Sequence, residues 1–428
     1  MSVNALLYHG LPAVLRNDYW IVVSSRFDKI ARIPDDKLND TSTRDGLATD
    51  GFFEQKEVAS HPSMSMVTLI TTSACNLRCK YCFVNSGDTC RLMPTNVAFA
   101  AIRKAVRNAK GKQFSIAFFG GEPTLTPRLI GEVVAYARKQ AVAEAVVIPS
   151  FSITTNGVMS DKLLQFLIRE RFVMTVSADG PPEVQDYQRP LKNGGRSSPF
   201  TENTIRTLAQ EGCEFKVRAT VTDFSVRYLR ETVEWLHGLG GTQLHVEPLS
   251  IAGRAAIASR GEGLQRPSSS EFADRLKEAI IRGNQLGVGI INSSYMNLVD
   301  PPLEFCEGSP QNRFAVTYHG DVTTCVEVQD RCHPVFPQFI VGRYDQLQDE
   351  LVMSKKHRER ACLVNIHTET QSTCVDCFAK RICAGGCPVR NFHVTGDSAH
   401  VDPYRCDMIR EMVPFVFHLL DDASEEAQ

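Results

Sequence analysis

The chain has 428 residues, a formal net charge of -2 and 14 cysteines. This length exceeds one ordinary hydrophobic core and predicts two or three domains. The near-neutral charge argues against electrostatic binding of nucleic acid, and the sequence shows neither a membrane-spanning apolar run nor a signal-peptide pattern, so we expect a cytoplasmic protein without a membrane partner. Because cytosolic thiols stay reduced, this many cysteines indicates metal binding or catalysis rather than disulfides.

The first segment, residues 1–62, carries no catalytic motif. A strand is predicted at residues 19–23, followed by a polar stretch that is rich in Asp and Thr and continues through Asp50. One interpretation is a small cap that packs on the next domain. The other is a platform that docks a partner or a peptide by strand addition, and the sequence does not distinguish between them.

From residue 66 onward, strand-like and helix-like segments alternate, which predicts βα units around a parallel sheet. Helices are expected from residue 94, near 126–142, near 160–170, and along an apolar stripe from residue 226 to 236. Six units fall short of the eight of a closed barrel. We therefore predict an α/β fold, a partial (β/α)6 TIM-like barrel over residues 63–290, with exposed loops at 190–200 and 261–270. The predicted strands cover residues 66–72, 114–119, 148–154, 173–177, 215–222 and 243–249.

Three cysteines follow the first predicted strand as a C-x3-C-x2-C run, Cys75, Cys79 and Cys82. A [4Fe–4S] cube normally takes four thiolates, one for each iron. Three thiolates on one short loop would therefore leave the fourth iron open for another ligand. A structural zinc site would need a closed set of four ligands, and a thioredoxin-like site needs only C-x-x-C. Loop cysteines without any cluster are the remaining alternative.

Polar residues and glycines follow the ends of the later predicted strands, where α/β folds place their chemistry. Gly120 and Gly121 allow a close backbone approach to a ligand, and Glu122 is an acceptor for an ammonium group. Arg218, on the fifth strand, can pair with a carboxylate. Each signal alone is weak, because Gly-Gly and Asp-Gly are ordinary turn sequences. The other side chains expected around the same mouth are Thr155, Asn156, Ser177 and Asp179.

In their order along the chain, the cysteine run and the segments 120–123, 155–157 and 177–181 resemble successive motifs of the radical S-adenosylmethionine (radical SAM) superfamily. The resemblance implies a [4Fe–4S] cluster whose open iron binds S-adenosyl-L-methionine, reductive cleavage of that cofactor, and a 5′-deoxyadenosyl radical that removes hydrogen from a substrate. It also implies an electron donor of the flavodoxin or ferredoxin type. It assigns cofactor binding to Tyr81, Gly120, Gly121, Glu122, Thr155, Asn156, Ser177, Asp179 and Arg218.

The C-terminal cysteines form a second pattern. Cys306 is followed by G-x4-C ending at Cys325, and a C-x2-C-x5-C-x3-C run spans residues 374–387. On spacing alone, a zinc site on the four cysteines of that run is an alternative. The whole series of seven cysteines, which ends at Cys406, resembles the SPASM domain, an auxiliary-cluster extension of many radical SAM enzymes. We therefore expect a SPASM domain over residues 291–428.

The SPASM resemblance implies two auxiliary [4Fe–4S] clusters with interleaved ligands. The inner cluster then has three assigned thiolates, and its fourth iron is open, binds a substrate group, or borrows Cys332 or Cys362; Asp300 occupies the place where some relatives carry a cysteine. Cys90 and Cys213 are expected to be buried thiols. The implied outer ligands are Cys374, Cys377, Cys383 and Cys406, and the implied inner ligands are Cys306, Cys325 and Cys387.

Enzymes with a SPASM domain mostly act on peptides, so a ribosomally made precursor peptide is the leading substrate, modified by cross-linking or oxidation. The alternatives are a small-molecule substrate, formylglycine formation in sulfatases, and a non-enzymatic iron–sulfur or zinc protein. Sulfatase-type enzymes usually carry Asp directly after the G-x4-C cysteine, whereas this chain has Val326 and then Glu327. In an extended chain Glu327 would face away from that place. Glu247 and Glu327 are the candidates for proton transfer.

Overall fold

The computed structural model describes residues 5–9, 11–26, 29–54, 66–109, 113–145, 147, 149–258, 263–295, 313–355, 368 and 371–426. Three residues named above, Asp300, Cys306 and Cys362, lie outside these ranges. Within the described ranges, no helix has the length and apolar character needed to cross a membrane.

One sheet runs through the molecule in the order β11-β10-β9-β8-β7-β6-β5-β12-β13-β14-β15. The six strands from β5 to β10 are parallel neighbours, which confirms the predicted parallel sheet, with strand ends shifted by a few residues. A short strand that was not predicted, β11 (Gly289–Ile291), extends the sheet parallel to β10. The six strands are β5 (Met66–Ile70), β6 (Ser115–Phe119), β7 (Ser150–Thr155), β8 (Val173–Ser177), β9 (Phe215–Val221) and β10 (Gln243–Pro248).

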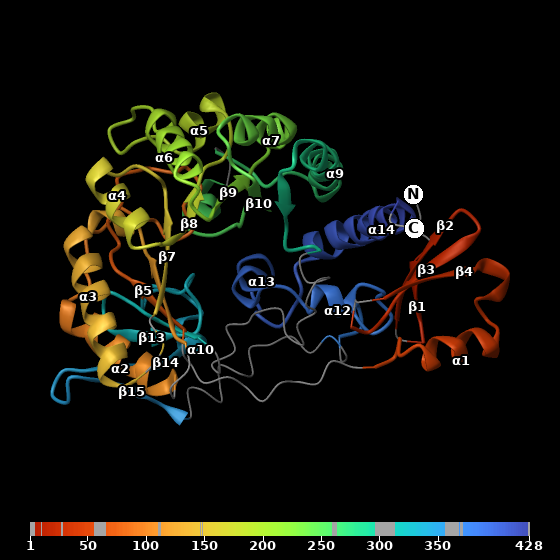
Figure 1. Ribbon diagram of the computed structural model, residues 1–428, viewed down its shortest axis with the longest axis horizontal. Coiled ribbons are helices and arrows are strands. Elements are labelled where there is room, and N and C mark those ends of the chain that lie inside the picture. Colours follow the sequence, from red (N-terminus) through yellow and green to blue (C-terminus); the bar gives the residue numbers. More distant parts are fainter. Residues whose placement is uncertain are drawn as a thin grey trace.

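Helices follow one another in an arc outside these strands, from α2 to α9 (Figure 1). The longer helices bury an apolar stripe, which in α2 includes Ala98, Ile102 and Ala105. The four predicted helices are confirmed, and α5, α6, α8 and α9 were not predicted. The helices are α2 (Thr95–Ala109), α3 (Pro127–Ala143), α4 (Asp161–Arg169), α5 (Pro182–Gln188), α6 (Ser198–Gln210), α7 (Leu229–Gly238), α8 (Arg254–Ala258) and α9 (Ser269–Leu286), with short 3-10 turns η2 (Pro123–Leu125) and η3 (Val226–Tyr228).

The predicted exposed loop at 190–200 is wrong at its end, because α6 already begins at Ser198. The Asp186 carboxylate accepts hydrogen bonds from the backbone N–H of Ser198 at 2.8 Å and from its hydroxyl at 2.9 Å. A carboxylate that satisfies a free N–H at a helix start stabilises that start. The capping residue lies twelve positions earlier in the sequence, so local patterns did not reveal it.

The C-terminal region continues the same sheet. Strand β12 (Arg313–Val316) pairs parallel with β5, and β13 (Asp321–Thr323), β14 (Ile340–Asp345) and β15 (Glu350–Met353) follow as antiparallel neighbours. Four helices complete the region. They are α10 (Phe336–Phe339), α12 (Lys380–Cys383), α13 (Pro388–Thr395) and α14 (Pro403–Glu426).

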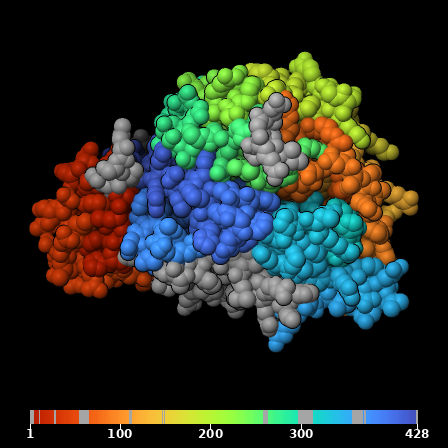
Figure 2. Space-filling view, turned by 180° about the vertical axis from the view of Figure 1, so that it is seen from behind, coloured from red at the N-terminus to blue at the C-terminus, as the bar shows by residue number. Residues whose placement is uncertain are grey.

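The N-terminal segment is a four-stranded antiparallel sheet with its own small core. The predicted strand at 19–23 is confirmed as β3, and the polar stretch through Asp50 contains β4, a 3-10 turn η1 and α1. Figure 2 shows this unit at one end of the molecule, beside the C-terminal region. Its elements are β1 (Ala5–Tyr8), β2 (Leu11–Arg16), β3 (Tyr19–Val23), β4 (Ile30–Pro34), η1 (Asp35–Lys37) and α1 (Thr41–Thr49).

A cluster of charges joins the N-terminal sheet to the end of α14. The fully buried Asp421 carboxylate accepts hydrogen bonds from Tyr19 at 2.6 Å, Arg16 at 2.7 Å and Arg32 at 2.5 Å. These donors come from three adjacent strands, so one carboxylate fixes the orientation of the whole sheet. Burial raises the pKa of Asp421 while the three donors lower it, and the net shift is downward.

Candidate active site

A cavity of about 390 Å³ lies at the carboxyl ends of β6 to β10. Its wall includes all three loop cysteines, Cys75, Cys79 and Cys82. Both predicted proton-transfer candidates, Glu247 and Glu327, lie on the same wall. Asp179 is not part of the wall, whereas the other residues predicted to bind the cofactor are, namely Tyr81, Gly120, Gly121, Glu122, Thr155, Asn156, Ser177 and Arg218.

The cysteine loop is held by backbone hydrogen bonds to residues 188–192. Arg78 N donates to Pro190 O at 2.8 Å, Lys80 N to Gln188 O at 2.9 Å, and Lys192 N to Asn76 O at 2.8 Å. This short antiparallel ladder fixes the loop without a regular strand. The three thiols therefore share one rigid backbone segment.

The loop also donates hydrogen bonds to its own sulfurs, from Leu77 N to Cys75 Sγ at 3.4 Å and from Ser86 N to Cys82 Sγ at 3.3 Å. Burial raises the pKa of Cys75 to about 12 and that of Cys79 to about 11. A metal deprotonates the thiols that bind it, which removes this penalty on bare thiolates. Three thiols on one cavity wall are the donor type that an iron–sulfur cube takes. Among the described residues, however, no three His, Cys, Asp or Glu side chains are gathered closely enough to hold a metal ion.

The two glycines after β6 press against the strand that leads into the cysteine loop. A Cβ on Gly120 would lie 2.5 Å from Thr72 O, and one on Gly121 would lie 2.2 Å from Ala74 O. Gly120 also has φ +141°, a conformation that favours glycine. These glycines allow contact between two backbone segments, and because they also line the cavity, the predicted close approach of a ligand stays a prediction.

Glu122 is 1% exposed and accepts four hydrogen bonds. Oε1 accepts hydrogen bonds from Thr124 N, Thr124 Oγ1 and Thr155 Oγ1. Among the described residues, Oε2 accepts one, from Asn156 N at 2.7 Å. Burial raises the pKa of the Glu122 carboxyl, and this effect is larger than the lowering of the pKa by the hydrogen-bond donors. Oε2 therefore keeps the capacity to accept one further hydrogen bond, and Glu122 is part of the cavity wall.

Asp179 contacts the cysteine loop from behind the cavity wall. Its Oδ2 accepts from Tyr81 Oη at 2.6 Å and from Gln188 Nε2 at 2.7 Å. Arg189 donates to the same Tyr81 hydroxyl at 2.6 Å. Burial, the largest cause, together with the nearby carboxylate, raises the pKa of Tyr81 well above its ordinary value. Asp179 thus positions Tyr81, which lines the cavity, rather than lining the cavity itself.

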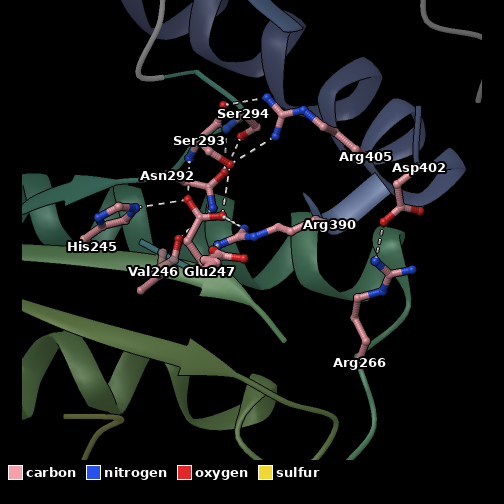
Figure 3. A network of polar contacts seen from close by, with 11 residues as sticks. His245, Val246, Glu247, Arg266, Asn292, Ser293, Ser294, Arg390, Asp402 and Arg405 are labelled. Carbon is pink, nitrogen blue, oxygen red and sulfur yellow. Dashed lines mark hydrogen bonds and ion pairs between the residues drawn. The ribbon is translucent and has the colours of Figure 1, made fainter. Parts of the chain in front are cut away.

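Glu247, at the end of β10, is fixed from several sides (Figure 3). It accepts from Ser293 N at 2.8 Å, Ser293 Oγ at 2.9 Å and His245 Nε2 at 3.0 Å, and Arg390 lies 3.4 Å away. Arg405 in turn donates to Ser293 Oγ and Ser293 O at 3.1 Å each. Burial raises the pKa of Glu247, but His245 and Arg390 outweigh it and lower that pKa below its ordinary value.

The chain is not extended at Glu327, so the condition under which this side chain would face away from the place of Asp is not met. Residues after Cys325 form a turn, with Val328 N bonded to Cys325 O at 3.3 Å, so the alternation of an extended chain does not apply. Both Val326 and Glu327 line the cavity. Glu327 lies 3.6 Å from Arg390 Nη2, so a single arginine faces both candidate carboxylates.

The C-terminal cysteines fall into two neighbourhoods. Burial raises the pKa of the Cys406 thiol to about 11, with smaller contributions from Cys383, Cys374 and Cys377. By contrast, Cys387 and Cys325 pack against one separate apolar cluster of Val328, Val335, Phe339 and Val389. The interleaved ligand sets and the zinc alternative both stay predictions.

The remaining described thiols differ in their surroundings. Cys213 is half-buried against the core, in line with its expected role as a small apolar residue. Cys90 is exposed, so its predicted burial is wrong. Its neighbours Arg91 and Leu92 pair with the chain near Thr72 and leave Cys90 on the outer side. Cys332, considered as a ligand of the inner cluster, is also exposed.

Sequence reasoning missed four residues of the site. Arg189, Lys216 and His245 line the cavity, and Arg390 links the two carboxylates. For Lys216 and His245 a signal existed, because strand alternation places them on the face of Arg218 and Glu247 respectively. No local pattern marks Arg189 or Arg390, which reach the cavity only through tertiary packing.

The sequence was compared with protein families and with known proteins. The family model described as the radical SAM superfamily matches residues 69–236. The cysteine-type anaerobic sulfatase-maturating enzyme of Clostridium perfringens is 23% identical over 371 residues, which cover 83% of this chain and 97% of the relative. The serine-type enzyme of Bacteroides thetaiotaomicron is also 23% identical, over 78% of this chain and 84% of its own.

Two solved structures share the fold. The structure of anSMEcpe with bound AdoMet and the Cp18Cys peptide has a TM-score of 0.67 and 20% identity, and covers 85% of this chain and 100% of its own. Streptococcus suis SuiB bound to its precursor peptide SuiA has a TM-score of 0.56 and 12% identity, over 94% and 98% of the two chains. Residues 69–236 therefore form a radical SAM domain, and over 83% of its length this chain is similar to a sulfatase-maturating enzyme.

Proposed function

We propose that the chain is a radical SAM/SPASM maturase that modifies a side chain of a peptide or protein substrate. One observation carries the proposal: the cavity that holds Cys75, Cys79 and Cys82 also contains Glu327 and Arg390 from the cysteine-rich C-terminal region. Domain limits of 1–62, 63–290 and 291–428, with a partial barrel in the second, remain part of this proposal.

The three loop cysteines would hold a [4Fe–4S] cluster, and the remaining wall would bind S-adenosyl-L-methionine. Bound together, these groups supply a 5′-deoxyadenosyl radical that takes a hydrogen atom from the substrate. Glu122 presents its free lone pair to the cofactor's ammonium group. Ser177 and Arg218, on neighbouring strands at paired positions, are placed to meet the carboxylate or ribose. Tyr81, held by Asp179 and Arg189, limits the space beside the cysteines.

The C-terminal cysteines would hold two auxiliary [4Fe–4S] clusters, which take up electrons when the substrate is oxidised. Cys374, Cys377, Cys383 and Cys406 would hold the outer cluster, in line with the effect of the first three thiols on the pKa of Cys406. Cys325 and Cys387, which pack on one apolar cluster, support an inner cluster, for which Cys306 would be a third ligand.

The two carboxylates of the wall suit different tasks. Glu247 has a lowered pKa and several donors, so it stays ionised and is a weak proton acceptor. Its task is therefore to position Arg390 at the cavity. Glu327 is half-buried, faces the cavity and has only a long contact to Arg390. It is the better candidate for removing a proton from the substrate.

Two substrate classes are supported. The likeness to SuiB, whose structure contains the precursor peptide SuiA, favours a precursor peptide, which we expect to be ribosomally made. The two sulfatase-maturating relatives favour formylglycine formation at Cys or Ser. The position of Glu327 inside the cavity supports this second candidate, because a carboxylate is available although Val326 occupies the place expected for Asp.

Anaerobically reconstituted protein tests the proposal. With dithionite it should form 5′-deoxyadenosine, and the Cys79→Ala variant should not. Two peptides, one encoded beside the gene and one carrying a sulfatase Cys or Ser site, are then compared by mass spectrometry for the loss of hydrogen. A wild-type protein that forms no more 5′-deoxyadenosine than Cys79→Ala would refute the enzyme assignment of these cysteines.

A further inference from the structure

A second tertiary contact of the cysteine loop is made by Arg254, the first residue of α8. Arg254 Nη1 donates a hydrogen bond to Cys79 O at 3.0 Å, and Nη2 donates to Ser86 O at 2.7 Å and to Asp88 Oδ1 at 2.8 Å. The backbone N–H of Arg254 donates to Cys82 O at 3.0 Å. One residue therefore bridges both ends of the segment 79–88, which contains two of the three loop cysteines.

The residues on either side of Arg254 pack directly on the same loop. A Cβ on Gly253 would lie 2.3 Å from Cys82 O, and Gly253 has φ +54°, a conformation that favours glycine. Ala255 packs in one apolar cluster with Tyr81, the residue before Cys82. Three consecutive residues thus contact the loop, and they fix the place from which the Arg254 side chain reaches it.

Arg254 brings an excess of positive charge to the loop. Arg78, within the loop, also contacts Asp88 Oδ1, at 3.1 Å, so two guanidinium groups share one carboxylate. The Arg254 side chain is the less exposed of the two, at 19% against 32%. A partly buried charge acts more strongly on its surroundings than a charge in water. Arg254 therefore combines a fixed geometry with a positive charge beside Cys79.

We propose that Arg254 is a positioning residue that holds the cysteine loop in place and makes the cluster on this loop easier to reduce. The inference rests on the proposed function, in which Cys75, Cys79 and Cys82 hold that cluster. The planar guanidinium fixes several acceptors at once, which an ammonium group cannot reproduce. Its charge stabilises the cluster that has gained one electron. An external reductant loses this electron, and no bond forms or breaks at Arg254.

The first test needs no cluster. In the iron-free full chain, Arg254→Met removes the guanidinium, and hydrogen exchange of the amides in residues 79–88 should become about tenfold faster or more. Arg282→Met is the matched control, because Arg282 is also a partly exposed arginine with an ion pair, to Glu234 at 2.7 Å, but joins α9 to α7. Exchange in residues 79–88 should not change in this control. Wild-type exchange in Arg254→Met would overturn the positioning role.

The second test measures the reduction potential of the reconstituted full chain. The cluster of the cysteine loop is the one whose electron paramagnetic resonance spectrum changes when S-adenosyl-L-methionine is added. In Arg254→Met, the equilibrium constant for its one-electron reduction should fall about tenfold, equal to about 59 mV. Arg254→Lys keeps the charge and should keep the wild-type potential, although it binds less iron. Loss of iron in both variants with an unchanged potential in both would show a merely structural role and overturn the electrostatic one.

The two tests separate this inference from the proposed function. A wild-type chain that binds no iron at the loop and forms no 5′-deoxyadenosine with dithionite would refute the proposed function, while faster loop exchange in Arg254→Met would still support the positioning role. An active wild type, together with wild-type exchange and wild-type potential in Arg254→Met, would overturn the role of Arg254 alone.

Discussion

The two cysteine-bearing regions of the chain are built in different ways. Cys75, Cys79 and Cys82 lie within eight residues on one loop, which a backbone ladder to residues 188–192 holds in place. The described C-terminal thiols come from separate turns and helices, with Cys383 in α12, Cys387 at the start of α13 and Cys406 in α14. Geometry within the first region is mostly local, whereas in the second it depends on packing. A change in one region should therefore leave the other intact.

The largest expected difference in the formation of 5′-deoxyadenosine is between the variants Cys79→Ala and Cys406→Ala. Loss of Cys79 should lower the formation of 5′-deoxyadenosine at least about 100-fold, which equals about 2.7 kcal/mol, because a cluster ligand is removed. Loss of Cys406 should keep that reaction and remove the outer auxiliary cluster, which iron counting and electron paramagnetic resonance detect. Cys374→Ala should resemble Cys406→Ala, and Cys387→Ala should affect a different cluster. A common spectrum for Cys387→Ala and Cys406→Ala would contradict the two neighbourhoods.

A substitution beside the first cysteine region, Gly121→Ala, tests whether that region depends on a close backbone contact. Gly121→Ala places a methyl group 2.2 Å from Ala74 O, so the cysteine loop has to shift. We expect iron binding at the loop to fall about tenfold or more, with a loss of stability of about 2–3 kcal/mol from overpacking. Gly131→Ala is the matched control, since nothing lies within 4 Å of its Cβ and alanine is the better helix former. Equal iron content in both variants would refute the close backbone contact.

Glu247 tests the contact between the two regions. Glu247→Gln should lower stability by about 3 kcal/mol, because Arg390 loses a charged partner within the wall, and substrate modification should fall more than cofactor cleavage. Because the folded pKa of Glu247 is lowered, its stabilising contribution is present above the unfolded value of about 4.3 and is lost as pH falls through the folded value. Urea unfolding between neutral and acid pH should therefore show a weaker acid dependence in the variant. An identical pH profile for both proteins would contradict this account.

The smallest effect is expected far from both regions, where Asp421 joins α14 to the N-terminal sheet. Asp421→Asn weakens three charge-assisted hydrogen bonds and should lower stability by about 2 kcal/mol, with the partly solvated arginines limiting the loss. Iron content and cofactor cleavage should not change. Hydrogen exchange in β2 to β4 should rise, and it should rise in the wild type as well when pH falls below the lowered pKa of Asp421. Loss of cluster iron in this variant would contradict the expected independence.

Much of the parallel sheet followed from the sequence alone. Each strand from β5 to β10 has apolar residues that alternate or run continuously, and each ends in residues such as Gly120 or Asn156 that are typical of a site. The position of the three cysteines on one loop could also be predicted, because their short spacing limits which thiols can share a cluster. For these features, local chain geometry is sufficient.

Tertiary structure alone decided the rest. Arg390 reaches the cavity from α13, more than 140 residues after Glu247, and no spacing rule links the two. The turn after Cys325 brought Glu327 into the cavity against the expectation for an extended chain. Asp179 faces Tyr81 because Gln188 and Thr220 hold it there, at 2.7 Å and 3.0 Å. In each case the partner is distant in sequence, so the side chain's direction depends on packing that local patterns do not encode.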